Sequence, residues 1–282
     1  MMEELRDVSF GRSAHMMAAA LLSVALSGCA PDAGESSELG DEETGEVASQ
    51  EQAISNGVVV PATSVQTSGV VSLQYWSTSE NRFVNHCTGT LLSNTAVITA
   101  RHCLDDLEAR TVTIKMGTER RTVVRRYLHP DKDVAIVKLD SGLPMFNWSY
   151  DHYLSNPQQL WTSWYGRSTY SGTNMSLKGA TIRCYGYGGS GVFDAPLKRA
   201  DFKVRVFGNE PAIQPRFMLQ LLKTASGQLH QAGDSGGPCM TSGGAMATET
   251  LYSVLSGCFN DFCYAHGAEE WRDWAALVMI SP

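Results

Sequence analysis

The sequence has few of the features that mark nucleic-acid-binding, metal-dependent or membrane-spanning proteins. Its 282 residues include 22 lysines and arginines against 29 acidic residues, a formal net charge of -7, so we expect no basic surface for nucleic acid. No spacing of potential ligands matches a metal site, and we expect no metal and no cofactor. The apolar run over residues 16–27 is too short to cross a bilayer. Helical periodicity is scarce before the end of the chain, which favours a fold built from strands.

Short segments with the character of half-buried strands recur along the chain. These segments are rich in β-branched and aromatic residues, and in most of them apolar and polar residues alternate. Gly, Asn or Asp separates one segment from the next. One helix is expected over residues 269–280, because Trp271, Ala275 and Val278 share a helical face after an acidic first turn. The clearest strands are residues 70–76, 111–116, 202–207 and 250–255.

The N-terminal apolar run resembles the signal of a bacterial lipoprotein, because it leads into Leu-Ser-Gly-Cys ending at Cys29. In that interpretation residues 1–28 are a signal peptide, Cys29 is the lipidated first residue, and the lipid is the only membrane attachment. The basic residues expected before the run are offset by acids, which leaves Met16 or Met17 as an alternative start. The alternative is an ordinary secretory signal cleaved near Ala30. We expect an exported protein in both cases, either a cell-envelope lipoprotein or an extracellular protein.

Residues 29–53 are predicted to form an acidic, disordered tether or propeptide. Eight carboxylates lie among serines and glycines between residues 31 and 52, with too little apolar surface to form a core. This segment accounts for much of the net negative charge. The acidity of the chain is therefore no guide to its substrate.

The most informative segment is Gly-Asp-Ser-Gly-Gly-Pro at residues 233–238. A serine hydroxyl is a poor nucleophile at neutral pH, so a serine flanked by glycines suggests a site where a base activates Ser235. Glycine permits tight turns and close approach of a substrate carbonyl. The amides of Gly233 and Ser235 can then point at one oxygen as an oxyanion hole.

His102 is the candidate base, and Asp133 is the candidate carboxylate that orients it. His102 lies in the segment Thr-Ala-Arg-His-Cys at residues 99–103. Asp133 precedes the apolar run over residues 134–139, at the start of an expected buried strand. An ionised carboxylate at such a position needs a partner. Asp131, beside a proline, is typical of a turn. Serine, histidine and aspartate together point to nucleophilic catalysis.

Residues 233–237 also satisfy the G-x-S-x-G pattern of α/β-hydrolases, which would make the protein an esterase. That fold needs its acid and its histidine after the serine, and Asp261 and His266 could take these roles. It also needs strands that alternate with helices. The sequence shows few helical periods, which disfavours this alternative.

The three motifs together resemble those of the chymotrypsin/trypsin-like serine peptidases. The histidine motif differs from that of the family at one position, Asp-Val-Ala from Asp133 matches the aspartate motif, and residues 233–238 match the serine motif. The order histidine, aspartate, serine is also that of the family. The resemblance covers about residues 54–274. It implies an all-β fold of two six-stranded antiparallel β-barrels with a C-terminal α-helix and the triad between the barrels.

The resemblance also implies how the peptidase domain over residues 54–282 is organised. Barrel 1 would occupy about residues 54–145, barrel 2 about 160–268, and the helix 269–280. The activity implied is serine endopeptidase activity on a protein or peptide substrate, and we expect a monomer. The alternative on the same fold is a catalytically silent, surface-displayed binding protein, which retention of all three motif residues disfavours.

The segment that begins at Ile54 resembles the mature start of the family, which implies a zymogen. Cleavage before Ile54 would free an ammonium group that pairs with Asp234, the residue beside the nucleophile. Ala53 precedes this bond, in place of a basic residue. Either another, activating peptidase matures the protein, or its own pocket accepts small residues.

Seven cysteines are an odd number for an exported protein. Lipidation of Cys29 leaves six for three disulfides. The family has a disulfide beside its histidine, and this position corresponds to Cys87 and Cys103. Cys184 and Cys239 lie slightly displaced in sequence from a second disulfide of the family. The pairs that we expect are Cys87–Cys103, Cys184–Cys239 and Cys258–Cys263.

The substrate pocket is expected from the family alignment. Leu229 aligns with the pocket floor, where it cannot supply the negative charge that binds a basic P1 residue, the residue before the scissile bond. Ser256, Gly257 and Cys258 align with the pocket wall. We therefore expect an uncharged, apolar or small P1 residue, with binding of an acidic side chain by His230 as the alternative.

Overall fold

The computed structural model describes residues 53–143, 163–164, 167–168, 177–206, 219–241, 251–259 and 262–281. The expected signal peptide, Cys29 and nearly all of the expected tether lie outside the described residues, as does Asp261. Among the helices that the structure describes, none has the length and apolar character needed to cross a membrane.

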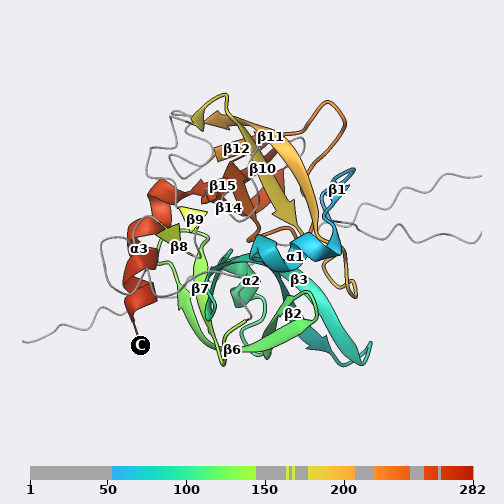
Figure 1. Ribbon diagram of the computed structural model, residues 1–282, viewed down its shortest axis with the longest axis vertical. Helices are drawn as coiled ribbons and strands as arrows, with labels where there is room; N and C mark the ends of the chain where they lie inside the picture. Colours follow the sequence, from blue (N-terminus) through green and yellow to red (C-terminus); the bar gives the residue numbers. More distant parts are fainter. Residues whose placement is uncertain are drawn as a thin grey trace, which may run out of the picture. The chain divides into compact units, whose positions relative to one another are not determined.

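The first six long strands form a closed antiparallel barrel, coloured from blue-green to green in Figure 1. Its strands neighbour one another in the order β2-β3-β4-β7-β6-β5, and pairing of β5 with β2 closes the ring. The strands are β2 (Val70–Ser77), β3 (Arg82–Ser93), β4 (Ala96–Thr99), β5 (Val112–Met116), β6 (Glu119–Leu128) and β7 (Ala135–Leu139).

Six later strands form a second closed barrel. Their order is β11-β10-β13-β14-β15-β12, and pairing of β11 with β12 closes the ring, while β1 adds to the free side of β11. The six strands are β10 (Thr181–Gly186), β11 (Lys198–Val206), β12 (Leu219–Leu222), β13 (Pro238–Thr241), β14 (Leu251–Phe259) and β15 (Phe262–Gly267), and the added strand β1 is Val58–Val59.

Two closed six-stranded antiparallel barrels confirm the fold class expected from the sequence. The four clearest expected strands correspond to β2, β5, β11 and β14. All strand pairs that the structure describes are antiparallel, so the parallel sheet of an α/β-hydrolase is excluded and the esterase alternative with it.

The start of the domain lies against the second barrel, although the expected boundaries assign it to the first. The backbone N–H of Ser55 donates to the carbonyl oxygen of Leu229 at 2.8 Å, and that of Val60 donates to Leu197 at 2.8 Å. Between these bonds β1 pairs with β11. Residues 54–60 therefore connect the second barrel to the beginning of the first.

The expected C-terminal helix is α3 (Ala268–Ile280), which begins one residue earlier than predicted. Two further described helices were not expected from the sequence, because each is too short to show a helical period: α1 (Ala62–Ser68) and α2 (His102–Asp105). A separate two-stranded sheet pairs β8 (Ser163–Trp164) with β9 (Arg167–Ser168).

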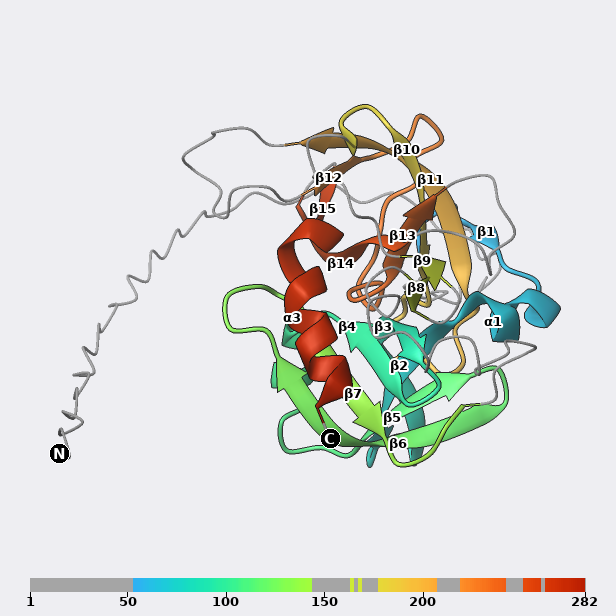
Figure 2. The same cartoon turned by 60° about the vertical axis from the view of Figure 1, so that its left-hand side comes forward.

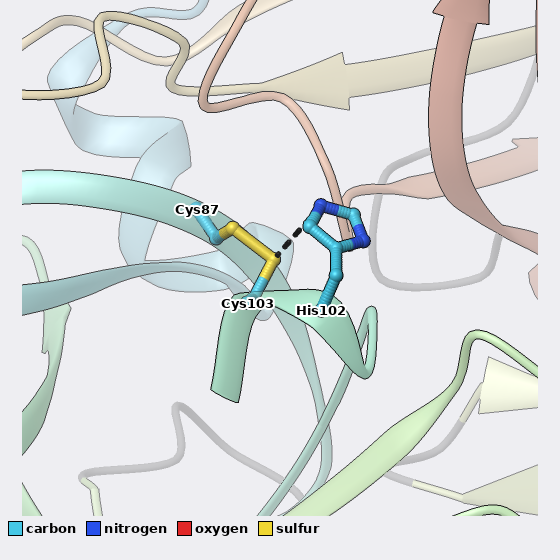
Figure 3. A group of neighbouring side chains, drawn as sticks. All are labelled: Cys87, His102 and Cys103. Carbon is cyan, nitrogen blue, oxygen red and sulfur yellow. Dashed lines mark hydrogen bonds between the residues drawn. A yellow bond between two sulfur atoms is a disulfide. The ribbon is translucent and has the colours of Figure 1, made fainter. Parts of the chain in front are cut away.

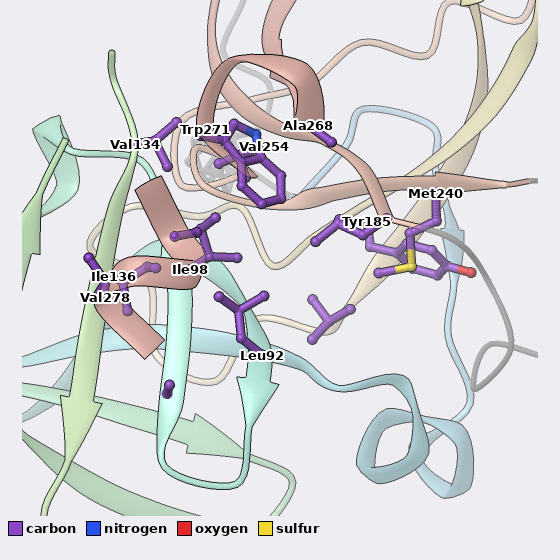
Figure 4. Packing of buried hydrophobic residues seen from close by; sticks show 14 of the residues in the cluster. Leu92, Ile98, Val134, Ile136, Tyr185, Met240, Val254, Ala268, Trp271 and Val278 are labelled. Carbon is purple, nitrogen blue, oxygen red and sulfur yellow. The ribbon is translucent and has the colours of Figure 1, made fainter. Parts of the chain in front are cut away.

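One hydrophobic cluster joins the two barrels and α3 (Figure 4). Ile98 and Ile136 come from the first barrel, Tyr185 and Val254 from the second, and Trp271 from α3, and all five are fully buried. Burial of each such side chain contributes about 1.5–3 kcal/mol relative to exposure. Figure 2 shows α3 running from the second barrel to the first, where the ammonium of a lysine on β7 donates to a carbonyl of its last turn. The cluster therefore fixes how the two barrels meet.

Three disulfides cross-link the described residues, and they are the pairs expected from the sequence. The last two join residues directly opposite each other on paired antiparallel strands. The bridges and their Cα–Cα distances are Cys87–Cys103 (6.1 Å), Cys184–Cys239 (4.0 Å) and Cys258–Cys263 (3.9 Å).

Candidate active site

His102 is the first residue of α2, just beyond the end of β4. The disulfide between Cys87 on β3 and Cys103 lies beside its ring (Figure 3), with the Cys103 Sγ atom 3.8 Å from His102 Nε2. A disulfide that closes a loop of this length, 16 residues, stabilises the folded protein by about 3 kcal/mol. The bridge therefore anchors the start of α2 to the first barrel.

Asp133 fixes the orientation of His102 through two hydrogen bonds. The Asp133 Oδ2 atom lies 2.8 Å from His102 Nδ1, and its Oδ1 atom accepts the backbone N–H of His102 at 2.9 Å. The hydroxyl of Ser256, on β14 of the second barrel, donates to the same Oδ2 atom. The carboxylate is therefore held from both barrels, and an ionised Asp133 requires the proton on Nδ1 and leaves Nε2 as the acceptor.

The pKa values of these two groups shift in opposite directions. Burial lowers the pKa of His102, but the hydrogen bond and the charge of Asp133 raise it more, so it lies above the usual 6.5. Burial raises the pKa of Asp133, but the hydrogen bond and charge of His102 and the Ser256 hydroxyl together lower it to about 2. Asp133 is thus ionised throughout the neutral range.

Ser235 lies in a tight loop before β13 that packs directly on the first barrel. Gly233 and Gly236 have φ values of +91° and +82°, which other residues rarely adopt, and a Cβ on Gly236 would lie 2.1 Å from Thr99 Oγ1. Thr88 on β3 holds the loop: its N–H donates to the Ser235 carbonyl and its hydroxyl to the Gly233 carbonyl, both at 2.9 Å. These bonds place Ser235 at the junction of the barrels.

The backbone amides of Gly233 and Ser235 donate to no acceptor among the described residues. The neighbouring amide of Gly236, by contrast, donates to the carbonyl of Leu255 at 2.7 Å. Backbone N–H groups are rarely left without an acceptor, so two such amides in one loop are available to an oxygen of a bound molecule.

The hydroxyl of Ser235 donates to the carbonyl oxygen of Ser256 at 3.2 Å. Within the described part of the chain, no hydrogen bond joins Ser235 to His102. The hydrogen bond between a nucleophile and its base is often long or misaligned when no substrate is bound. Transfer of the Ser235 proton to His102 therefore requires the hydroxyl to turn away from Ser256.

Asp234 is fully buried and accepts hydrogen bonds from the start of the domain. The N–H of Ile54 donates to Asp234 Oδ2 at 3.0 Å, and the N–H of Gln231 donates to the same atom at 2.7 Å. The ring of His230 lies 3.8 Å from this oxygen through Nδ1, and both side chains are completely inaccessible. The ring stacks on Phe202, with centroids 4.5 Å apart. His230 therefore contributes its backbone, not its imidazole, to the surface beside Ser235.

The other expected pocket residues lie in the segments on either side of Ser235. Leu229 pairs with Ser55 through its backbone, and its half-buried side chain packs against the core of the second barrel. Gly257 is half-buried and Cys258 is exposed, and both follow Ser256 on β14. The Ser256 side chain binds Asp133, a contact that the expected role of lining the pocket did not include.

A second histidine–carboxylate pair lies behind Asp133 and was not expected from the sequence. His266 Nε2 accepts the backbone N–H of Asp133 at 3.3 Å, so its Nδ1 carries the proton and donates to Glu270 Oε2 at 2.8 Å. Glu270 also accepts the N–H of Gly267 at 3.2 Å and pairs with Lys132 at 3.3 Å. The i,i+4 spacing of His266 and Glu270 was a usable signal for their contact.

Two groups of side chains within the described residues bring a histidine close to two cysteine sulfurs. One contains His102 and the other His230. All four sulfurs are in disulfides and offer no thiolate. Neither group has the donor set of a metal site.

Two closed antiparallel barrels with serine, histidine and aspartate at their junction define the chymotrypsin-like class of serine peptidase folds. The family model described as Trypsin matches residues 57–265, which is most of the chain. The chain belongs to the trypsin family, and its class of activity is that of a peptidase.

Relatives and solved structures agree with this assignment. An uncharacterized peptidase of Corynebacterium glutamicum is 26% identical over 244 residues, which cover 83% of this chain and 77% of the relative. A peptidase-named protein from another strain of that species has the same identity and coverage. These relatives are similar to the chain over most of both lengths.

Two solved structures share the fold. An inactivated protease paralogue of the scabies mite has a TM-score of 0.57 and 16% identity, and covers 78% of this chain and 99% of its own. HL collagenase has a TM-score of 0.52 and 18% identity, and covers 80% and 99% respectively. Because one of the two is inactivated, the shared fold by itself does not establish catalysis.

Proposed function

We propose that the protein is a serine endopeptidase in which His102, Asp133 and Ser235 form a catalytic triad. The observation that carries the proposal is that the amides of Gly233 and Ser235 have no acceptor among the described residues, at the same barrel junction where Asp133 holds His102. A serine, an oriented histidine and an oxyanion site are the parts that acyl transfer requires. Protein or peptide substrates follow from membership of the trypsin family.

Catalysis would begin when Nε2 of His102 takes the Ser235 proton as the oxygen attacks the scissile carbonyl carbon. His102 then gives this proton to the leaving amine as the peptide C–N bond breaks, which leaves an acyl-enzyme. Water attacks the ester carbonyl, and His102 takes a proton from it. That proton returns to Ser235 as the acid product leaves.

The amides of Gly233 and Ser235 would stabilise the negative oxygen formed in each attack. Loss of one such donor typically costs 10²–10³-fold in rate, on the order of 3–4 kcal/mol. Asp133 stabilises the protonated His102 that accompanies the oxyanion, in agreement with the raised pKa of His102.

We also propose activation by cleavage between Ala53 and Ile54. A free ammonium at Ile54 would bring a positive charge to the buried Asp234 carboxylate, which already accepts the Ile54 N–H at 3.0 Å. Ala53 is itself fully buried against Gly188, where a peptidase cannot reach it. Cleavage must therefore precede docking of Ile54.

Three disulfides in a trypsin-like fold are typical of exported proteins. We propose export through residues 1–28, with Cys29 as the point of lipid attachment. An uncharged P1 residue is proposed on the ground that the described pocket segments carry no charged side chain exposed beside Ser235: Leu229 is apolar and the imidazole of His230 is buried.

Active-site labelling tests the proposal directly. The processed protein and a Ser235→Ala variant are treated with a fluorophosphonate, and both the label and the N-terminus are mapped by mass spectrometry. We expect label on Ser235, a first residue of Ile54, and no label in the variant. A correctly processed protein without label would instead be the silent binding protein considered above.

A further inference from the structure

The P1 side chain of a bound substrate must enter beside Ser235. Two segments border this serine: residues 229–234, which lead to it, and Ser256–Cys258 of β14, whose first carbonyl accepts the Ser235 hydroxyl at 3.2 Å. The family alignment puts the P1 pocket between these two segments, and they are accordingly its expected walls in the proposed peptidase.

The two walls touch each other. The Sγ atom of Cys258 lies 3.7 Å from the carbonyl oxygen of His230. Heavy atoms at this distance are in direct contact, so no carbon atom fits between them. The space that a long P1 side chain would need is occupied at this point by the Cys258 sulfur.

Neither wall can withdraw by turning a side chain. Cys258 is bonded to Cys263, which lies directly opposite on β15 and is fully buried. On the other wall the ring of His230 is fully buried and stacked on Phe202, which holds the backbone that bears the contacting carbonyl. Opening the contact requires movement of a strand or loss of the disulfide.

We infer that the Cys258–Cys263 disulfide closes the P1 pocket and restricts cleavage to bonds that follow a small residue, namely glycine, alanine or serine. The inference rests on the proposed function and specifies its substrate class. It replaces the broader expectation of an uncharged P1 residue with a limit on size.

The proposed activation site fits this limit. Ala53 would be the P1 residue of the bond whose cleavage frees Ile54. A second, already active copy of the chain could therefore carry out the cleavage. A peptidase that requires a basic residue could not.

The test compares tetrapeptide amides that differ only in P1, as glycine, alanine, serine, leucine, phenylalanine or arginine. For the processed wild-type protein we expect kcat/KM for alanine to exceed that for leucine and phenylalanine by about 100-fold or more, since even one methylene group that does not match its pocket costs about 10–200-fold. A profile in which leucine, phenylalanine or arginine is preferred overturns the inference without any variant.

A double variant then tests the disulfide itself. Cys258→Gly with Cys263→Gly removes both sulfurs, and the alanine-to-leucine ratio should fall at least tenfold. The matched control is Cys184→Ala with Cys239→Ala, which removes the other cross-strand bridge of the same barrel and should leave the ratio unchanged. If the glycine variant folds, as judged by circular dichroism, and keeps the wild-type ratio, the disulfide does not close the pocket. If it does not fold, the wild-type profile decides.

Failure of this inference is distinct from failure of the proposed function. The small fluorophosphonate does not need the P1 pocket to reach Ser235. Label on Ser235 together with a preference for large P1 residues contradicts only the closed pocket. Absence of label contradicts the peptidase itself.

Discussion

At the scale of single residues, the pKa of His102 determines the pH range in which the site can work. In the proposed mechanism His102 must be neutral to accept the Ser235 proton, and Asp133 raises the pKa of His102 above 6.5. Protonation as the pH falls removes the base. The same Asp133 that holds the ring in position therefore narrows the active range on the acid side.

The pH dependence of kcat/KM should accordingly show an acid limb with a midpoint above 6.5. In Asp133→Asn, loss of the negative charge should lower this midpoint and reduce activity by about 10⁴-fold, because the ring loses the partner that selects its tautomer. Steady-state kinetics from pH 5 to 9 measure both effects. Asp131→Asn is the control, and its profile should match the wild type. An unchanged midpoint in Asp133→Asn would show that another group titrates.

Asp234 is the residue that connects processing to activity in the proposed mechanism. In processed Asp234→Asn the Ile54 ammonium would lose its buried partner, which typically costs 3–5 kcal/mol, so we expect kcat/KM to fall by at least about 100-fold. The rate of fluorophosphonate labelling at Ser235 should fall in parallel. Asp201→Asn removes an exposed partner of Arg183 and serves as the control. Full activity in Asp234→Asn would argue against activation through this contact.

At the scale of elements, the first turn of α3 supports the segment before β7 that carries Asp133. The Glu270 carboxylate accepts a hydrogen bond from the His266 ring and forms an ion pair with Lys132. It also accepts the backbone N–H of Gly267 at the start of α3. His266 in turn accepts the Asp133 amide. Glu270 is thus a positioning residue, which acts on the site through two intermediates and touches no substrate.

Glu270→Ala should reduce kcat about 10-fold or more with little change in KM, because a buried hydrogen bond to a charged group contributes about 1.5–3 kcal/mol. Glu270→Gln keeps an oxygen that accepts the His266 proton and should restore most of kcat. The melting temperature is followed in parallel. A merely structural role would lower the melting temperature in both variants without this rescue of kcat. The exposed neighbour Glu269, changed to alanine, is the matched control.

The sequence was sufficient for those features that lie in contiguous segments. His102, Asp133 and Ser235 each stand in a short motif, and the buried strands and α3 show regular periodicity. The contacts that it did not reveal join distant positions: Asp133 with His266, and His230 with Cys258. These contacts depend on strand register and on which way a side chain turns, and a one-residue shift would abolish them. The packing of the Leu229 side chain depends in the same way on a distant position. The backbone of Leu229 pairs with Ser55, and this pairing fixes where the side chain lies.

At the scale of the whole molecule, the site is divided between two barrels that meet at the shared core. His102 and Asp133 belong to the first barrel, whereas Ser235 and Ser256 belong to the second. The Ser256 hydroxyl on Asp133 and the Thr88 bonds to the serine loop cross the junction. Relative movement of the barrels would break these bonds before either barrel unfolds.

The division of the site also determines when the protein can become active during its synthesis. The ribosome completes the first barrel, with His102 and Asp133, about a hundred residues before it reaches Ser235. The second barrel closes only after β15, which ends at Gly267. A nascent chain therefore carries the proposed base without the nucleophile for much of its translation, and the proposed peptidase cannot attack other proteins until its own synthesis is nearly complete.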